Sequence, residues 1–278
     1  MPDLRTVTEP ARAKLNLALH VRHRRPDGYH ELETLFAFVE HGDTVRVTPA
    51  EADSFTMTGP FAGVLAGEGD NLVTRAAARF RAAFGCGPHA IVLEKNLPVA
   101  SGIGGGSADA AATLRALAAL SGIDLEDPRL FAIADGLGSD VPACLLGRTA
   151  LGRGRGEQLT PLSGLAGVPT LLVNPGVGVS TAAVFKAWDG IDRGPIGTGA
   201  LLSVALAGRN DLEPPARALA PAIDAVLAAL AAQPGMVLAR MSGSGATCFA
   251  LFDSEDARDA AAAALDRPGW WVAPTRLT

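Results

Sequence analysis

The sequence predicts a chain of mixed α and β structure. Three observations lead to this prediction. Apolar and polar residues alternate in stretches such as 13–21, and longer Ala-rich stretches such as 107–120 have a helical pattern. A third stretch, 147–168, is rich in glycine, arginine and turns, and it separates two sets of such elements. The 278 residues allow one large domain or two of ordinary size. We place a boundary within 158–168 and assign residues 1–160 and 161–278 to two domains.

The elements of the first half follow from local patterns. Alternation over 13–21 predicts a half-buried strand with Lys14, Asn16 and His20 on its polar face. A Pro-Asp-Gly turn follows at 26–28. The remaining predicted elements, in chain order, are a strand over 43–49, a helix over 71–84, a strand over 89–95, a helix over about 107–120, and short helices within 127–138 and 139–147.

The second half begins with a predicted strand at 169–176. Helical patterns near 181–188 and 215–232 come next. The segment "ARMSGSGATCFALF" (239–252) predicts a strand, a glycine turn and a second strand. A helix over 254–265 and a short terminal strand complete the chain.

Composition and charge limit the classes of function. The chain is 48% hydrophobic and 19% charged, and it has no apolar run of 18 residues and no signal-peptide profile at its N-terminus. Three widely spaced cysteines without a CxxC pair argue against a disulfide framework or a zinc site. The net charge of −5 argues against a nucleic-acid partner. We expect a soluble cytoplasmic protein without a membrane partner, and no obligate protein partner is evident.

Lysine is rare in this arginine-rich chain. Only Lys14, Lys95 and Lys186 occur among 24 basic residues. Where a chain uses arginine in place of lysine almost everywhere, a lysine that remains indicates a site that needs a compact ammonium group. Chance is the alternative explanation. Tyr29, the single tyrosine, stands out in the same way.

The segment "PVASGIGGGSADAA" (98–111) has the composition of a phosphate-binding loop. It is not a P-loop, because Ser107 and Ala108 follow the last glycine where a P-loop has lysine. It also departs from the dinucleotide-binding fingerprint G-x-G-x-x-G. The third glycine of that fingerprint would fall at position 107, where this chain has serine. Glycines still let backbone N–H groups approach an anion, and Ser107 is placed to cap the following helix. A glycine-rich connector capped by serine is the alternative.

Five segments in this order carry a resemblance: Lys14-Leu-Asn16, "PDGYH", the glycine loop, "LGSDVP" and "MSGSGAT". With them the sequence resembles the GHMP kinases, which include galactokinase, homoserine kinase and mevalonate kinase. The resemblance covers nearly the full length. The opening "AKLNL…DGYHELET" is similar to members that phosphorylate the 2-hydroxyl of a cytidine-diphosphate-linked methylerythritol in non-mevalonate isoprenoid synthesis. Ala108 replaces the second serine common in the family loop, and Ile103 replaces a leucine.

The resemblance implies an α+β, two-domain GHMP kinase fold with the active site in the cleft between the domains. It implies ATP as phosphoryl donor with Mg²⁺, which we expect phosphates and water to hold, without a named protein ligand. The implied ATP-binding residues are Pro98, Val99, Ala100, Ser101, Gly102, Ile103, Gly104, Gly105, Gly106, Ser107 and Ala108.

The resemblance implies that Lys14 and Asp140 are catalytic. Asp140 would orient the attacking hydroxyl and accept its proton late in the reaction, because an alcohol is far more basic than a carboxylate with a pKa of about 4. Lys14 would keep Asp140 ionised and bring positive charge toward the transferring phosphoryl group. The alternatives are a helix N-cap worth roughly 1 kcal/mol for Asp140 and a solvated strand residue for Lys14.

The implied substrate-binding residues are Asn16, Tyr29, His30, Lys95 and Phe185. Tyr29, His30 and Phe185 would hold the cytosine by stacking and hydrogen bonds, and Lys95 would reach the nucleotide or the substrate diphosphate. The alternatives are an exposed polar strand residue for Asn16, core packing for Phe185, and a strand-end lysine in water for Lys95. "MSGSGAT" brings further amides to the ligands or is simply a hairpin turn. Rival functions are another GHMP kinase, of the homoserine or mevalonate type, and a non-catalytic nucleotide-binding protein.

Overall fold

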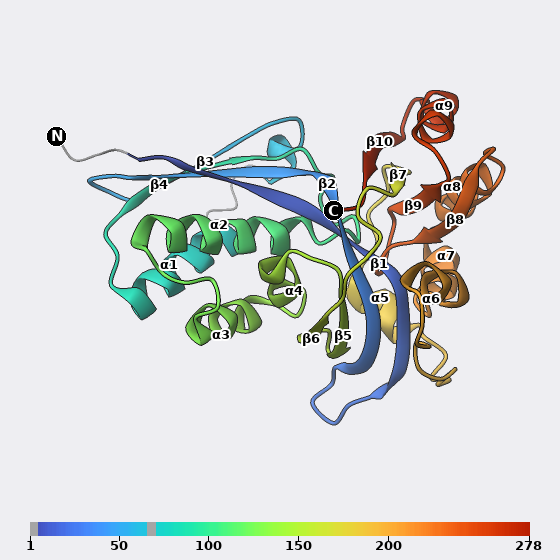
Figure 1. The fold of residues 1–278 in the computed structure, drawn as a ribbon, viewed down its shortest axis with the longest axis horizontal. Coiled ribbons are helices and arrows are strands. Elements are labelled where there is room, and N and C mark those ends of the chain that lie inside the picture. Colours follow the sequence, from blue (N-terminus) through green and yellow to red (C-terminus); the bar gives the residue numbers. More distant parts are fainter. Residues whose placement is uncertain (1–4, 66–70) are drawn as a thin grey trace. The chain divides into compact units, whose positions relative to one another are not determined.

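The computed structural model describes residues 5–65 and 71–278. Its strands are β1 (Val7–Arg24), β2 (His30–Pro49), β3 (Ser54–Thr58), β4 (His89–Glu94), β5 (Ala150–Gly154), β6 (Gln158–Pro161), β7 (Pro169–Asn174), β8 (Met236–Met241), β9 (Cys248–Phe252) and β10 (Trp271–Arg276) (Figure 1). Its helices are the 3₁₀ turn η1 (Ala62–Leu65) and α1 (Leu72–Phe84), α2 (Gly105–Ser121), α3 (Pro128–Leu137), α4 (Val141–Leu146), α5 (Thr181–Lys186), α6 (Leu201–Ala207), α7 (Glu213–Leu219), α8 (Ala222–Ala231) and α9 (Glu255–Leu265). The predicted mixture of helices and strands is confirmed.

The chain forms two compact units, and each is assembled from separate stretches of sequence. The first unit contains Met1–Ala13, Gly42–Val99 and Gly104–Gly147. The second contains Lys14–His41, Ala100–Ile103 and Arg148–Thr278. The long strands β1 and β2 pair with each other and contribute residues to both units. The predicted domain boundary at 160/161 stays a prediction.

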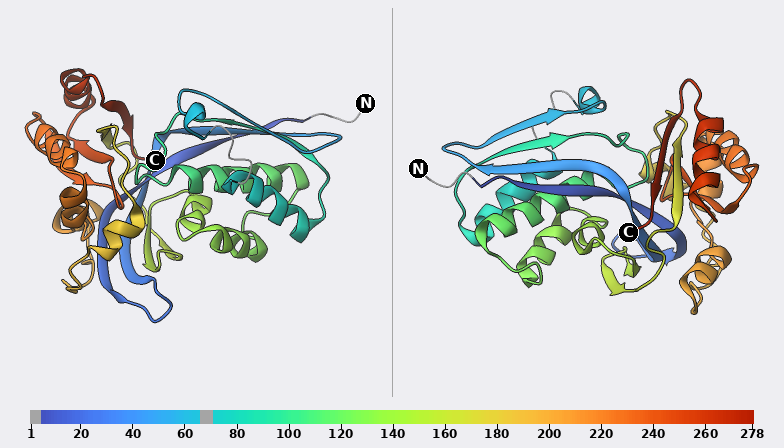
Figure 2. Two further views of the ribbon diagram at one scale, coloured as in Figure 1. Left: turned by 180° about the vertical axis from the view of Figure 1, so that it is seen from behind. Right: turned by 45° about the horizontal axis from the view of Figure 1, so that its top comes forward.

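In the first unit a sheet is covered by helices. Within this unit the strand order is β3-β4-β2; β4 pairs antiparallel with 44–49 of β2 and parallel with β3. The helices α1 to α4 lie on one face of these strands (Figures 1 and 2). Helix α1 begins at the capping box of Asn71 and Thr74, buries Phe80 on its inner side, and ends at Gly85 in the left-handed conformation. These are the start and stop signals that the sequence shows.

Helix α2 lies at the centre of the first unit and packs against α1, α3 and α4. Its alanines are buried on several sides, so neighbouring helices approach it closely. The helix begins at Gly105, two residues before the predicted start, and Gly104 is its N-cap. The predicted capping role of Ser107 is therefore wrong, because Ser107 already lies in the first turn.

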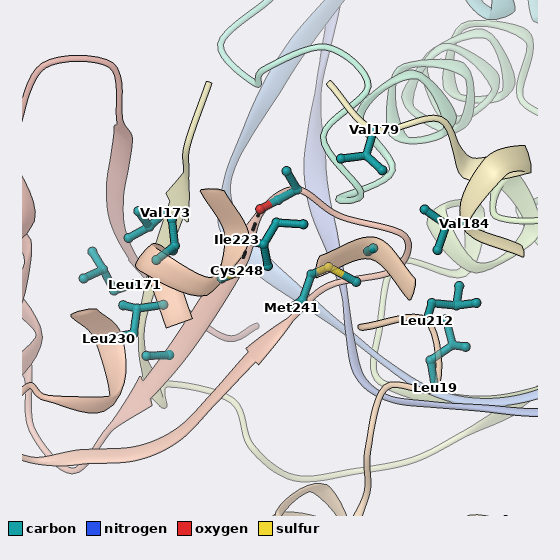
Figure 3. Close-up of a cluster of buried hydrophobic side chains, with 14 of the residues drawn as sticks. Leu19, Leu171, Val173, Val179, Val184, Leu212, Ile223, Leu230, Met241 and Cys248 are labelled. Carbon is teal, nitrogen blue, oxygen red and sulfur yellow. Dashed lines mark hydrogen bonds between the residues drawn. The ribbon is translucent and has the colours of Figure 1, made fainter. Parts of the chain in front are cut away.

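In the second unit an antiparallel sheet with the order β10-β7-β9-β8 is covered by α8 and α9. Apolar side chains of this sheet, of α5, α7 and α8, and of β1 form one hydrophobic cluster. Figure 3 shows part of it, with Ile223 of α8 near Met241 and Cys248 of the sheet. A second set of strands, in the order β2-β5-β6, belongs to the same unit.

Several predicted elements differ from the structure. The single helix expected over 215–232 is two helices, because α7 ends before Pro221, whose ring cannot continue a helix. Strand β2 begins at His30, well before the predicted start at 43, and β3, β5, β6 and α6 were not predicted. The strand over 13–21 exists within β1, but it is buried on both faces and not half-buried.

Candidate active site

Strand β1 places Lys14 and Asn16 in buried surroundings, where polar groups require hydrogen-bond partners. Lys14 Nζ donates to Asn16 Oδ1 over 2.9 Å, and it lies 5.5 Å from the centre of the Phe36 ring. Asn16 Nδ2 donates to Thr34 Oγ1 over 2.8 Å. The alternative of solvated strand residues is therefore wrong for both. These two side chains are held in defined positions by neighbours on β1 and β2.

The tip of the glycine loop, residues 100–103, packs within the second unit against the turn 242–247. Ser242 Oγ donates to Gly102 O over 3.1 Å, and it accepts from the backbone N–H of Asn16. A Cβ on Gly102 would lie 2.6 Å from Ser242 O, and a Cβ on Gly243 would lie 2.8 Å from Gly102 O. Glycine at these two positions is required by close backbone contact. The turn "SGSGAT" thus supports the loop and the strand that carries Asn16.

The end of the loop leads into α2 within the first unit. Gly104 has a φ of +68°, which favours glycine, and the first helical bond runs from Ala108 N to Gly104 O. The amides of residues 105–107 consequently have no partner within this fully described helix, whose first turn contains no acidic residue. This end fits an anion. Of the predicted ATP-binding residues, 98–99 and 104–108 belong to the first unit and 100–103 to the second.

Gly106 differs from the other loop glycines. It is exposed, and among the described residues an added Cβ would meet only Leu72 Cδ1, at an ordinary 3.6 Å. By contrast, a Cβ on Gly105 would lie 3.1 Å from Lys95 Nζ. The protein itself therefore tolerates a side chain at 106, so Gly106 is the position at which a substitution tests the approach of a ligand.

Lys95 is only 2% exposed. Its ammonium forms salt bridges with Asp43 and, over 2.9 Å, with Asp109. The alternative of a strand-end lysine in water is wrong. Burial alone would lower the pKa of Lys95, but its interactions with the two acids Asp109 and Asp43 outweigh burial and raise that pKa. Two of the three N–H groups of Lys95 are thus used inside the first unit.

Asp140 is the N-cap residue of α4 and is half-buried. Its side chain makes no capping hydrogen bond to the described residues of α4, and Pro142 at the second helical position has no N–H to donate. The N-cap alternative for this carboxylate is therefore wrong. The helix holds the Asp140 backbone and leaves the side chain out of the cap.

An aromatic cluster lies at the start of β2 in the second unit. His30 stacks on Phe185 with ring centres 4.9 Å apart, and Trp188 meets His30 edge-on at 5.7 Å. Tyr29 is 54% exposed, with the Arg155 guanidinium 5.1 Å from its ring centre. Burial, and then the nearby Arg24 charge, lowers the pKa of His30, which favours the neutral form of its ring. Two residues predicted to bind the base therefore lie side by side.

Several residues in contact with predicted site residues were missed in the sequence. Trp188 follows Phe185 by three residues, a spacing that places both on one side of a helical turn and was a usable signal. Asp43, Asp109 and Thr34 had no such signal, because their partners lie 14 to 52 positions away.

Residues 5–65 and 71–278 lack two kinds of feature. They contain no group of three or more His, Cys, Asp or Glu side chains arranged to hold a metal ion. They also contain no helix with the length and apolar character needed to cross a membrane.

Comparison with known proteins matches two family models: the GHMP kinases N terminal domain over residues 71–148 and the GHMP kinases C terminal over 196–269. Curated 4-diphosphocytidyl-2-C-methyl-D-erythritol kinases from Rhizorhabdus wittichii and Novosphingobium aromaticivorans are 57% and 51% identical, covering 97% and 96% of this chain and 94% and 91% of theirs. A crystal structure of 4-(cytidine 5'-diphospho)-2C-methyl-D-erythritol kinase aligns with a TM-score of 0.80 at 39% identity, over 98% of this chain and 99% of that one. The resemblance drawn from the motifs is confirmed: this chain belongs to the GHMP kinase family of ATP-dependent small-molecule kinases.

Proposed function

We propose that this kinase transfers the γ-phosphoryl group of ATP to the 2-hydroxyl of 4-diphosphocytidyl-2-C-methyl-D-erythritol. The observation that carries the proposal is the stacked pair of His30 and Phe185, with Tyr29 beside it, in a chain whose curated relatives have that name. An aromatic surface suits a nucleobase, because every base offers a face for stacking. Homoserine and mevalonate have no such base.

Phosphoryl transfer has a loose transition state, so catalysis depends on positioning and on charge stabilisation. The amides of residues 105–107, which have no partner within α2, are suited to phosphate oxygens, with loop residues 98–108 surrounding the donor. Lys14 brings a positive charge to the transferring group. Asp140 orients the substrate hydroxyl and accepts its proton, a role that a side chain outside the helix cap leaves open.

The remaining proposed contacts belong to the acceptor substrate. Asn16, fixed by Thr34, positions the reacting alcohol. Tyr29, His30 and Phe185 hold the cytosine; neutral His30 both donates and accepts hydrogen bonds. Lys95 has one N–H beyond those given to its two carboxylates, and this group is its proposed link to the nucleotide or the diphosphate.

Mg²⁺ is the proposed partner of ATP, held by phosphate oxygens and water, and we assign no residue to it. We also propose two domains, over 1–160 and 161–278, and a location in the cytoplasm. The three cysteines are free, as is usual for proteins of a reducing compartment.

An ATP-consumption assay tests the proposal. The purified protein is given ATP and Mg²⁺ with the cytidine substrate, homoserine or mevalonate, each in parallel. We expect turnover with the cytidine substrate alone. Turnover with homoserine or mevalonate instead would identify another GHMP kinase. ATP binding without turnover of any alcohol would indicate a nucleotide-binding protein that has lost its chemistry.

A further inference from the structure

Three buried ionisable side chains lie together next to the glycine loop of the first unit. Lys95 follows β4, Asp43 belongs to β2, and Asp109 lies in α2. The Lys95 ammonium contacts both carboxylates. One cation therefore faces two acids in a place from which water is largely excluded.

The two acids are not equivalent. Asp43 accepts hydrogen bonds from the backbone N–H groups of Asn96 and Leu97 in addition to the Lys95 ammonium. Among the residues that the structure describes, the Asp109 carboxyl group accepts only from Lys95, and its buried Oδ1 has no hydrogen-bond partner. An ionised carboxylate is poorly tolerated in such surroundings, whereas a neutral acid has an O–H to donate to Asp43.

The cluster joins the two ends of the loop. Residues 95–97 lead into it, and residues 105–109 lead out of it into α2. A Cβ on Gly105 would lie 3.1 Å from Lys95 Nζ and 3.8 Å from Asp43 Oδ2, so the ammonium lies directly against the loop backbone. A change of charge in the cluster therefore acts next to the amides of residues 105–107, which have no partner within α2.

We propose that Asp43, Lys95 and Asp109 form a positioning cluster that fixes both ends of the loop, with Asp43 and Lys95 as an ion pair and Asp109 as a neutral acid. The inference rests on the proposed binding of ATP phosphates by this loop. None of the three residues needs to touch the reacting atoms for this role.

The electrostatics agree with this assignment. Burial, and then the charge of Asp43, raises the pKa of Asp109 to about 8, although Lys95 acts in the opposite direction. Other titratable groups on the helices packed against α2 are, by helix, Arg75, Arg79 and Arg81 of α1, Arg129 and Asp135 of α3, and Cys144 of α4. Of these, Arg81 pairs with Asp53 and Arg129 with Asp127 at the surface.

The raised pKa gives the pH dependence a definite sign. The protonated Asp109 side chain contributes to the free energy of unfolding. This contribution is fully present below the ordinary aspartate pKa of about 4, and it is lost as pH rises toward 8. Above about pH 8 Asp109 ionises in the folded protein, which places a net negative charge under the loop. A polyanion such as ATP should then bind less tightly.

The test compares ATP affinity of the full chain by calorimetry at pH 6.5 and pH 9 in Asp109→Asn, Asp43→Asn and the unchanged protein. Asp256→Asn, an exposed acid in the first turn of α9, is the matched control. From pH 6.5 to pH 9, we expect the ATP affinity of the unchanged protein and of the control to fall about fivefold more than that of Asp109→Asn. The reason is that asparagine mimics the neutral acid at both pH values. Asp43→Asn should lose roughly tenfold or more at both pH values, because it breaks the ion pair.

Two results would overturn the assignment. Equal losses for Asp43→Asn and Asp109→Asn would mean that both acids are ionised partners of Lys95. The same pH profile for the unchanged protein and Asp109→Asn would mean that Asp109 does not carry the proton.

A carboxyl ¹³C NMR titration keeps the test independent of ligand binding and of the folding of Asp43→Asn. We expect one aspartate signal that titrates near pH 8 and is absent in Asp109→Asn. That signal without any ATP binding would reject the proposed role of the loop and leave the neutral acid in place. Absence of such a signal in a protein that binds ATP would reject the neutral acid alone.

Discussion

The region proposed for phosphoryl transfer and the region proposed for the base are built in different ways. In the first, Lys14 and Asn16 are buried, and side-chain hydrogen bonds hold them to each other and to Thr34. In the second, His30 is held by ring contacts, and Tyr29 is more than half exposed. One region is held by buried hydrogen bonds before any ligand arrives, whereas the other combines half-buried rings with one exposed tyrosine.

The difference matches the two tasks. Charge that develops during phosphoryl transfer is stabilised best by dipoles and charges that need no reorganisation. A nucleobase needs an accessible face for stacking, and tight packing would close that face. We therefore expect the two regions to separate in their kinetics: changes in the first alter turnover or ATP affinity, and changes in the second alter affinity for the cytidine substrate.

The largest effect should come from Asp140→Asn. The amide keeps the shape of the side chain and removes the proton acceptor, so kcat should fall by a factor on the order of 10²–10⁴. We expect the variant to stay folded, because asparagine keeps the size and shape of the side chain. Steady-state kinetics and a thermal melt measure both quantities. A folded variant with near-normal turnover would remove Asp140 from the mechanism.

Two substitutions in the glycine loop should produce the next effect. Gly104→Val forces a branched residue to a φ of +68° and should weaken ATP binding by a factor on the order of 10². Gly106→Ala, which the protein itself tolerates, should weaken ATP binding by roughly tenfold if phosphate lies against the loop. Calorimetry with ATP and with the cytidine substrate separates the two ligands. Unchanged ATP affinity in Gly106→Ala would show that no ligand approaches the loop there.

Tyr29→Ala and His30→Ala probe the other region. Each should weaken binding of the cytidine substrate by about 1–3 kcal/mol, through a lost stack or an unpaired polar edge. Free CMP should compete with the substrate in the unchanged enzyme and poorly in both variants, while ATP affinity holds. Equal CMP binding by all three proteins would leave a GHMP kinase with a different acceptor.

The smallest effect should come from Trp188→Ala. Trp188 meets His30 edge-on, so its loss frees the His30 ring without removing it. We expect a loss of about 0.5–1.5 kcal/mol in affinity for the cytidine substrate, less than for His30→Ala, with kcat and ATP affinity unchanged. Competition by CMP measures it, with Trp188→Phe as the conservative control. A larger loss than for His30→Ala would mean that Trp188 contacts the base itself.

Local features of the fold were readable in the sequence because they depend on neighbours in the chain. The capping box at Asn71, the glycine that ends α1 and the serine that begins α9 each act within four residues. The alternation along β1 and the glycine turn between β8 and β9 are equally local. Motif order was also sufficient for the family, since the spacing of such segments needs no coordinates.

Burial and charge pairing were decided only by the tertiary structure. Nothing near Lys95 shows that Asp43, fifty-two positions away, meets its ammonium, or that Asn16 finds Thr34 across the strands. The same holds for the glycines: Gly102 is required by a turn 140 residues later, whereas a Cβ on Gly106 would make only an ordinary contact with Leu72 among the described residues. A side chain's periodicity tells which way it points, but its environment depends on which distant segment packs there, and that is settled by the folded chain as a whole.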